Sequence, residues 1–194
     1  AYRPVCTINL VTGDTRWPIG RILHHASGVR LIVFRGTVAE DEWVKDILIM
    51  QTDAPFAPEI DAGIAPGTRV HMGFAQMFQQ LDPPPESWGD YLDDSNDPHA
   101  APLVLTGNSL GGALATLAAM QLHRRKPRLI TFGAPRVGNP AFAERFAQLI
   151  PPGRALRVGN HWDPIADLPD EKVDLFFREY DYRHAGPEHR IYSL

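Results

Sequence analysis

The sequence contains a single cysteine, Cys6, so no disulfide can form within the chain. Its neighbours, Val5 and Thr7 to Leu10, are typical of a strand, and a buried, inert thiol is the expected state. No nucleophile motif surrounds Cys6, and no group of histidine, cysteine and aspartate residues has the spacing of a metal site. A thiol enzyme and a metal enzyme are therefore not favoured.

Dense positive charge is also missing. The formal net charge is -4, and the one short basic segment, residues 123–126, falls at the end of a predicted helix, where cations suit the helix dipole. Nucleic-acid binding is therefore not expected.

Long apolar runs are absent as well, so no segment is predicted to span a membrane. No apolar stretch follows Ala1 to Pro4 as it would in a signal peptide. A secreted mature chain and a cytoplasmic chain both fit this pattern. The sequence carries no signal for the oligomeric state.

The length of 194 residues and an apolar content of 44% suit one domain spanning residues 1–194. Apolar runs that predict strands alternate with segments that predict helices. This order predicts an α/β fold with a mostly parallel central sheet covered by helices on both faces. The predicted strands are residues 29–34, 102–106, 128–132 and 155–158, and the predicted helices are 42–49, 73–81, 110–124 and 139–150.

Residues 81–102 differ in composition from the rest of the chain. Three consecutive prolines, Pro83 to Pro85, stop a helix, and an acidic stretch rich in proline, asparagine and serine follows. The ligand order of an EF-hand calcium loop is missing. The segment is predicted to be a solvated surface loop.

A G-x-S-x-G motif, Gly107 to Gly111, lies between a predicted buried strand and the strongest predicted helix. This context is the one that a nucleophile elbow requires, because the tight strand-to-helix turn leaves no room for side chains at the glycines. Ser109 is then the predicted nucleophile. The alternative is a serine that only caps the helix after a glycine turn.

With Ser109 placed, the sequence resembles the class 3 (fungal-type) lipase family, within the α/β-hydrolase superfamily, over residues 31–192. The order of the matching blocks agrees with the family. The blocks are Val33-Phe-Arg-Gly-Thr37, Val70-His-Met-Gly-Phe74, Thr106-Gly-Asn-Ser-Leu-Gly-Gly-Ala-Leu-Ala115, Thr131-Phe-Gly-Ala-Pro-Arg-Val-Gly-Asn139, and a looser match from Arg157 to Pro169.

This resemblance implies an α/β-hydrolase fold and a Ser-Asp-His triad in that chain order. It implies hydrolysis of carboxylic esters without a cofactor. Triacylglycerol or acylglycerol lipase activity leads, at a lipid–water interface where the substrate requires one. Phospholipase A1 and feruloyl or short-chain esterase activity are alternatives on the same site. A catalytically inactive, lipid-binding relative is a further alternative from a different class.

The acid and base follow from the resemblance. Asp163 matches the family block after the fourth predicted strand, with Asp167 as the alternative acid. In the family order the base comes after the acid, which leaves His184 and His189. His184 lies in a Tyr-x-His-x-Gly segment that resembles a family block, so it is the predicted base.

The oxyanion hole is predicted to use the backbone N–H of Leu110 and, by resemblance, the N–H of Thr37. Gly36 lets the strand end come close to the substrate.

The residues that follow Thr37 are the lid candidate. Trp43, Val44, Ile47 and Leu48 give an amphipathic helix that either covers the cleft or packs on the core. Asp46 has a structural role by resemblance.

One departure from the family lies in the elbow itself. The family usually has histidine before the nucleophile, whereas this sequence has Asn108. The change leaves catalysis intact and alters the hydrogen bonding beside Ser109.

Overall fold

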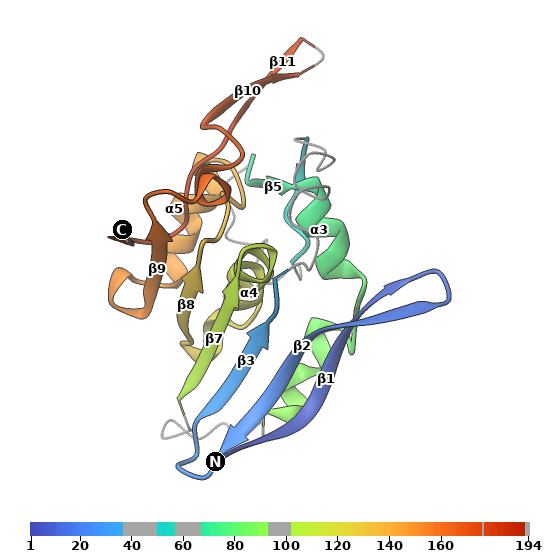
Figure 1. Cartoon of the computed structure of the whole chain (residues 1–194). Helices are drawn as coiled ribbons and strands as arrows, with labels where there is room; N and C mark the ends of the chain where they lie inside the picture. The colour runs from blue at the N-terminus through green and yellow to red at the C-terminus, as the bar shows by residue number, and fades with distance from the viewer. Residues whose placement is uncertain (37–49, 57–66, 93–101, 176, 193–194) are drawn as a thin grey trace.

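The protein is described by a computed structural model over residues 1–36, 50–56, 67–92, 102–175 and 177–192. Its centre is an eight-stranded sheet in the order β12-β9-β8-β7-β3-β2-β1-β6, shown in Figure 1. The first five strands of that order run parallel and the last three are antiparallel. Their bounds are β1 Tyr2–Thr12, β2 Thr15–His25, β3 Arg30–Phe34, β6 Leu81–Asp82, β7 Leu103–Asn108, β8 Arg128–Phe132, β9 Ala155–Asn160 and β12 Glu188–Ile191.

Helices and short strand pairs connect these strands. The predictions of helices at 73–81, 110–124 and 139–150 are confirmed within a few residues, and Asn139 caps the third helix by accepting a hydrogen bond from the Phe142 N–H at 3.0 Å. No helix among the described residues is long and apolar enough to cross a bilayer. The remaining bounds are β4 Gln51–Asp53, β5 Arg69–His71, α3 Met72–Gln79, η1 Pro85–Tyr91, α4 Leu110–Gln121, η2 His123–Arg125, α5 Pro140–Leu149, η3 Pro152–Arg154, η4 Pro164–Asp167, β10 Lys172–Leu175 and β11 Arg178–Asp181.

The predicted helix at 42–49 lies outside the described residues. The long β1–β2 hairpin was predicted only in part, around Cys6. Its second strand carries Pro18 and Gly20, which weaken the sequence pattern of a strand. Burial raises the pKa of the Cys6 thiol, so that it stays protonated.

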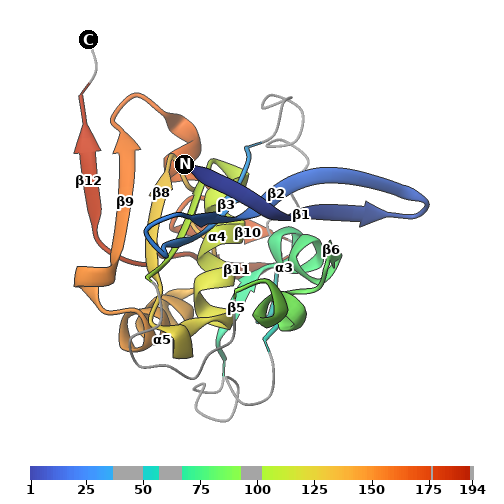
Figure 2. The same ribbon diagram turned by 90° about the horizontal axis from the view of Figure 1, so that it is seen from below.

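The two faces of the sheet differ. Ile32 and Leu105 point toward the helices and are fully buried, whereas Phe132 and Leu156 point the other way and are 46% and 40% exposed. The helices α3, α4 and α5 lie on the same side of the sheet in Figures 1 and 2. The sequence predicted helices on both faces, but among the described residues they cover one.

Helix α4 is the centre of the core. Every residue from Leu110 to Met120 is buried, because the helix packs behind β3, β7 and β8 and against α3. A helix that is apolar on all sides is stable only in such surroundings. This packing fixes the position of the helix start, where Ser109 lies.

The prediction of a solvated loop at 81–102 is wrong for its first half. Residues 85–91 form the 3₁₀ helix η1, and Trp88 is fully buried against Phe34 and Phe78. The indole N–H of Trp88 donates to the Pro83 carbonyl at 2.9 Å. The prolines therefore turn the chain back into the core instead of keeping it in solvent.

His71, before α3, is a buried polar side chain that this packing holds neutral. Its Nδ1 accepts from the Gly73 N–H at 3.1 Å, its ring stacks on Phe74, and its Nε2 is buried without a hydrogen-bond partner in the described structure. Burial lowers the pKa of His71 to about 4. The unfolded chain therefore takes up a proton at higher pH than the folded chain does.

Stability should consequently fall as the pH drops from 6.5 toward 4. The His71 contribution is on the order of 2 kcal/mol between pH 7 and pH 5. The variant His71→Asn, which keeps a capping acceptor, should show a smaller pH dependence when urea unfolding is compared at pH 7 and pH 5. Equal pH dependence in both proteins would refute this account of His71.

Candidate active site

Ser109 lies between β7 and α4 in a backbone conformation that non-glycine residues rarely adopt, with φ 50° and ψ -124°. Its N–H donates to the Phe132 carbonyl at 2.8 Å, and its carbonyl accepts from the Gly112 N–H at 2.9 Å. Its side chain makes no capping hydrogen bond to the helix. Because strain of this kind persists only where the surroundings impose it, a simple helix cap does not account for Ser109.

Close backbone contacts impose that conformation. A Cβ atom at Gly107 would lie 2.2 Å from the Gly111 carbonyl oxygen, and one at Gly111 would lie 2.5 Å from the Arg35 carbonyl oxygen. A Cβ at Gly112 would meet the Ala134 side chain at 2.6 Å. The glycines thus let helix α4 approach the ends of β3, β7 and β8 together.

The backbone around Ser109 offers hydrogen-bond donors. The N–H groups in the first turn of a helix have no partner within that helix, and Leu110 is the first residue of α4. From the side of β3, a Cβ at Gly36 would lie 3.7 Å from the Ser109 Cβ, so the chain passes directly beside the nucleophile. Thr37 and the lid candidates Trp43, Val44, Ile47 and Leu48 lie outside the described residues.

Asp163 follows β9 at the same edge of the sheet. Its Oδ1 accepts from the Ile165 N–H at 3.0 Å, and its Oδ2 lies 2.7 Å from the place of a Cβ on Gly133. Gly133 has φ 54°, and a Cβ on it would also lie 3.9 Å from the Asn108 Nδ2. The side chains of Asp163 and Asn108 therefore both lie close to Gly133. The alternative acid, Asp167, is bound to Arg190 at 2.9 Å.

Arg136, which was not predicted as a site residue, supports the loop that follows Asp163. Arg136 is 9% exposed, its side chain donates to the Asp167 carbonyl and, at 2.8 Å, to the Pro169 carbonyl, and its N–H donates to the Leu168 carbonyl at 2.7 Å. Arg136 lies in one of the family blocks, which was the available signal. It fixes the loop that carries Asp163.

Among the described residues, His184, the predicted base, is not hydrogen-bonded to Ser109 or Asp163. Its ring bonds to the Ala166 backbone, and its Nε2 is buried without a hydrogen-bond partner in the described part of the chain. Burial and the nearby guanidinium groups of Arg157 and Arg136 lower the pKa of His184 to about 3. The ring is therefore neutral, and among the described residues no carboxylate is hydrogen-bonded to it.

Asn108, the departure from the family pattern, connects the strands on either side of the elbow. Its Nδ2 donates to the Phe132 carbonyl at 3.3 Å, and its Oδ1 lies 2.9 Å from the place of a Cβ on Gly36. The side chain therefore spans from the end of β8 to the end of β3, across Ser109.

Known proteins resemble this chain in sequence and in structure. Residues 31–173 match the family described as "Lipase (class 3)". This chain belongs to the class 3 lipase family. The structural neighbours have the α/β-hydrolase fold of fungal lipases, in agreement with the fold predicted from the sequence.

Three relatives and structures illustrate the similarity. A lipase of Rhizomucor miehei is 31% identical over 82% of this chain and 41% of its own length, and a phospholipase A1 of Oryza sativa subsp. indica is 33% identical over 81% and 41%. The solved Rhizomucor miehei lipase propeptide complex has a TM-score of 0.76 at 29% identity, covering 99% of this chain and 56% of that one. This class 3 lipase chain thus spans about half the length of these relatives.

The glycine contacts give a direct test of the elbow. We expect Gly107→Ala to destabilise the protein by more than about 4 kcal/mol, because its Cβ would meet backbone atoms that cannot move separately. Gly153→Ala is the control, since a Cβ there meets nothing within 4 Å. Thermal unfolding of the two variants measures the difference, and equal melting temperatures would contradict the predicted close approach.

Proposed function

We propose that this chain carries the nucleophile and acid of a serine-dependent carboxylic ester hydrolase that acts on acylglycerols. The observation that carries the proposal is the strained Ser109 at the start of α4, with Asp163 arriving at the same sheet edge beside Gly133. A serine that only capped the helix would not need this conformation.

The chemistry follows from this placement. Ser109 Oγ attacks the ester carbonyl and a base removes its proton, while the N–H groups of Leu110 and Thr37 stabilise the negative oxygen. The alcohol leaves with a proton from that base, and water then releases the acid from the acyl-enzyme. Asp163 orients the base and stabilises its charged form.

The base remains a prediction. His184 follows Asp163 in the chain, as the family order requires, but its ring is bonded to Ala166 and surrounded by arginines. To act on Ser109, the Nε2 of the ring, which has no hydrogen-bond partner among the described residues, would have to accept the Ser109 proton.

The names of the relatives support an acyl-lipid substrate. They include a lipase of Rhizomucor miehei and a secreted mono- and diacylglycerol lipase of Penicillium cyclopium, which is 28% identical over 87% of this chain. The phospholipase A1 of Oryza sativa subsp. indica supports phospholipid cleavage as the second candidate. Both reactions use the same acyl-transfer site.

Hydrolysis of p-nitrophenyl esters from acetyl to palmitoyl tests the proposal. The wild type should hydrolyse them, and Ser109→Ala should lose on the order of 10⁴-fold or more in kcat. The chain-length profile then distinguishes a lipase from a short-chain esterase. Equal rates from folded wild type and Ser109→Ala would show that Ser109 is idle.

The pH profile tests the base. A lowered pKa keeps the neutral, proton-accepting ring at lower pH, so with His184 in its present surroundings kcat/KM should stay level from pH 7 down to about pH 4. Circular dichroism at each pH verifies that the protein stays folded.

An acid limb near pH 6.5 instead would contradict His184 as the base in this setting. His184→Gln adds an independent readout. If the variant keeps activity within about tenfold while its melting temperature falls, the ring supports the acid loop and another group removes the proton.

A further inference from the structure

The turn between β10 and β11 exposes an aromatic side chain completely. Leu175 pairs with Arg178, so the hairpin turn consists of the two residues Phe176 and Phe177. The Phe177 side chain is fully exposed, with a relative exposure of 109%. This is the highest value among the large apolar side chains in the described part of the chain. Phe176 lies outside the described residues.

These turn residues are not the ones that favour a hairpin. Two-residue hairpin turns prefer Asn-Gly or Asp-Gly, because their backbone needs positive φ angles. Phe177 has φ 63°, a conformation that is unfavourable for a bulky residue. Phe177 thus opposes local folding and also leaves apolar surface in water, so its place in the turn is not explained by the stability of this chain.

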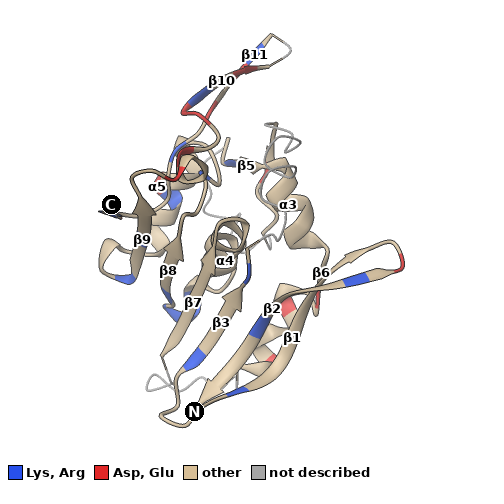
Figure 3. Cartoon of the chain, viewed as in Figure 1, with Lys and Arg blue, Asp and Glu red and all other residues tan. Residues whose placement is uncertain are grey.

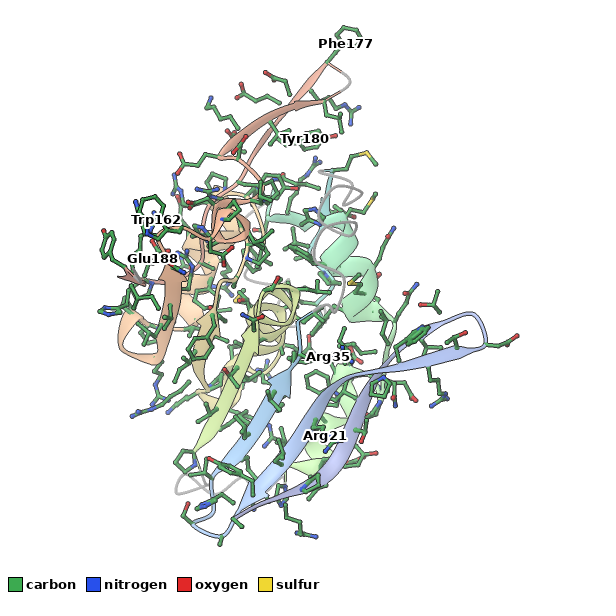
Figure 4. The ribbon with its side chains drawn as sticks, in the orientation of Figure 1. Arg21, Arg35, Trp162, Phe177, Tyr180 and Glu188 are labelled. Atoms are coloured by element: carbon green, nitrogen blue, oxygen red, sulfur yellow. The ribbon has the colours of Figure 1, made fainter. Side chains whose placement is uncertain are left out.

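The base of the hairpin is held firmly. Tyr182 is buried and its N–H donates to the Glu171 carbonyl at 2.8 Å, while the Gln51 side chain donates to the Asp181 carbonyl at 2.6 Å. The next residue, Arg183, donates its N–H to the Gly138 carbonyl at 2.9 Å. The hairpin therefore projects from a fixed base, with Phe177 at its tip, as Figures 1 and 4 show.

The exposed side chains of the hairpin stem are charged, whereas Val173, Leu175 and Tyr180 are half-buried. Lys172 and Glu179 form an ion pair at 3.1 Å, both well exposed, and the ribbon of the two strands carries both acidic and basic residues in Figure 3. Arg178, next to Phe177, is the charged residue nearest the turn. The hairpin thus combines an apolar tip with a stem suited to water, the distribution expected where a segment enters an apolar phase only at its end.

The hairpin lies on the side of the molecule that carries the proposed chemistry. It follows the loop of Asp163 in the chain and projects beyond the carboxyl ends of β3 and β7 in Figure 1. Trp162, immediately before Asp163, is 70% exposed at the same sheet edge. A surface that binds the tip would therefore face the edge where Ser109 and Asp163 meet.

We propose that the β10–β11 hairpin is an interfacial anchor, whose exposed Phe177 inserts into the surface of aggregated lipid and holds the Ser109 edge against it. The partner is a lipid–water interface, because a fully exposed aromatic side chain at the end of a stem with charged, exposed side chains suits a lipid surface. The proposal rests on the proposed acyl-lipid hydrolase function. It accounts for the exposed Phe177 and its unfavourable backbone conformation.

The double variant Phe176→Asn, Phe177→Gly tests the anchor, since it supplies favoured turn residues and should fold at least as well as the parent. Binding is measured by flotation with phosphatidylcholine vesicles, in a Ser109→Ala background so that no lipid is hydrolysed. We expect the partition coefficient to fall on the order of tenfold or more, from the loss of apolar side chains in the lipid. Trp17→Ser is the matched control, because Trp17 is 61% exposed on the distant β1–β2 hairpin, and its binding should not change.

Equal vesicle binding by the Asn-Gly variant and its parent would overturn the proposal. Equal loss in Trp17→Ser would overturn it too, because it would show non-specific adhesion. Concentration-dependent dimerisation that the Asn-Gly variant abolishes, without any vesicle binding by the parent, would assign the tip to a second copy of the chain. Binding is measured without turnover, so failure of the anchor and failure of the hydrolase proposal remain distinguishable.

Discussion

The close approach of helix α4 to the carboxyl ends of three strands is the constraint on which the proposed site depends. Gly107 and Gly111 allow the approach, because any side chain there would meet backbone atoms. The approach forces Ser109 into positive φ and turns its side chain away from the helix cap. It also places Leu110 at the helix start and brings Gly36 beside Ser109. The proposed nucleophile, the proposed oxyanion donor and the nearby strand end are thus brought together by one packing contact.

A second group of contacts positions the acid and determines the surroundings of His184. Arg136 holds the loop after Asp163 by donating a hydrogen bond to the Pro169 carbonyl. Arg157 forms an ion pair with Glu188 at 3.1 Å. Burial lowers the pKa of Arg157 to about 10, while the charge of Glu188 opposes that change. Burial and these cations together lower the pKa of His184 and keep its ring neutral.

The sequence predicted the strands and helices around the elbow because continuous apolar runs and the glycine motif act locally. It did not predict that Trp88 is buried, since the surrounding prolines and acidic residues are typical of a solvated loop. The hydrogen bonding of the His184 ring could not be predicted either, because a resemblance in a short segment does not indicate which ring nitrogen bonds to which partner. Which face of the sheet the described helices leave uncovered also depends on tertiary packing, and no local sequence pattern indicates it.

Labelling with a fluorophosphonate tests the central claim, an activated Ser109, most directly. The account predicts that the folded wild type forms one adduct, located on Ser109 by peptide mass spectrometry, and that Ser109→Ala forms none. It also predicts slower labelling of Asp163→Asn, because the orientation of the base is lost. A folded wild-type protein that leaves Ser109 unlabelled at the concentration and time that label an active serine hydrolase would contradict the account.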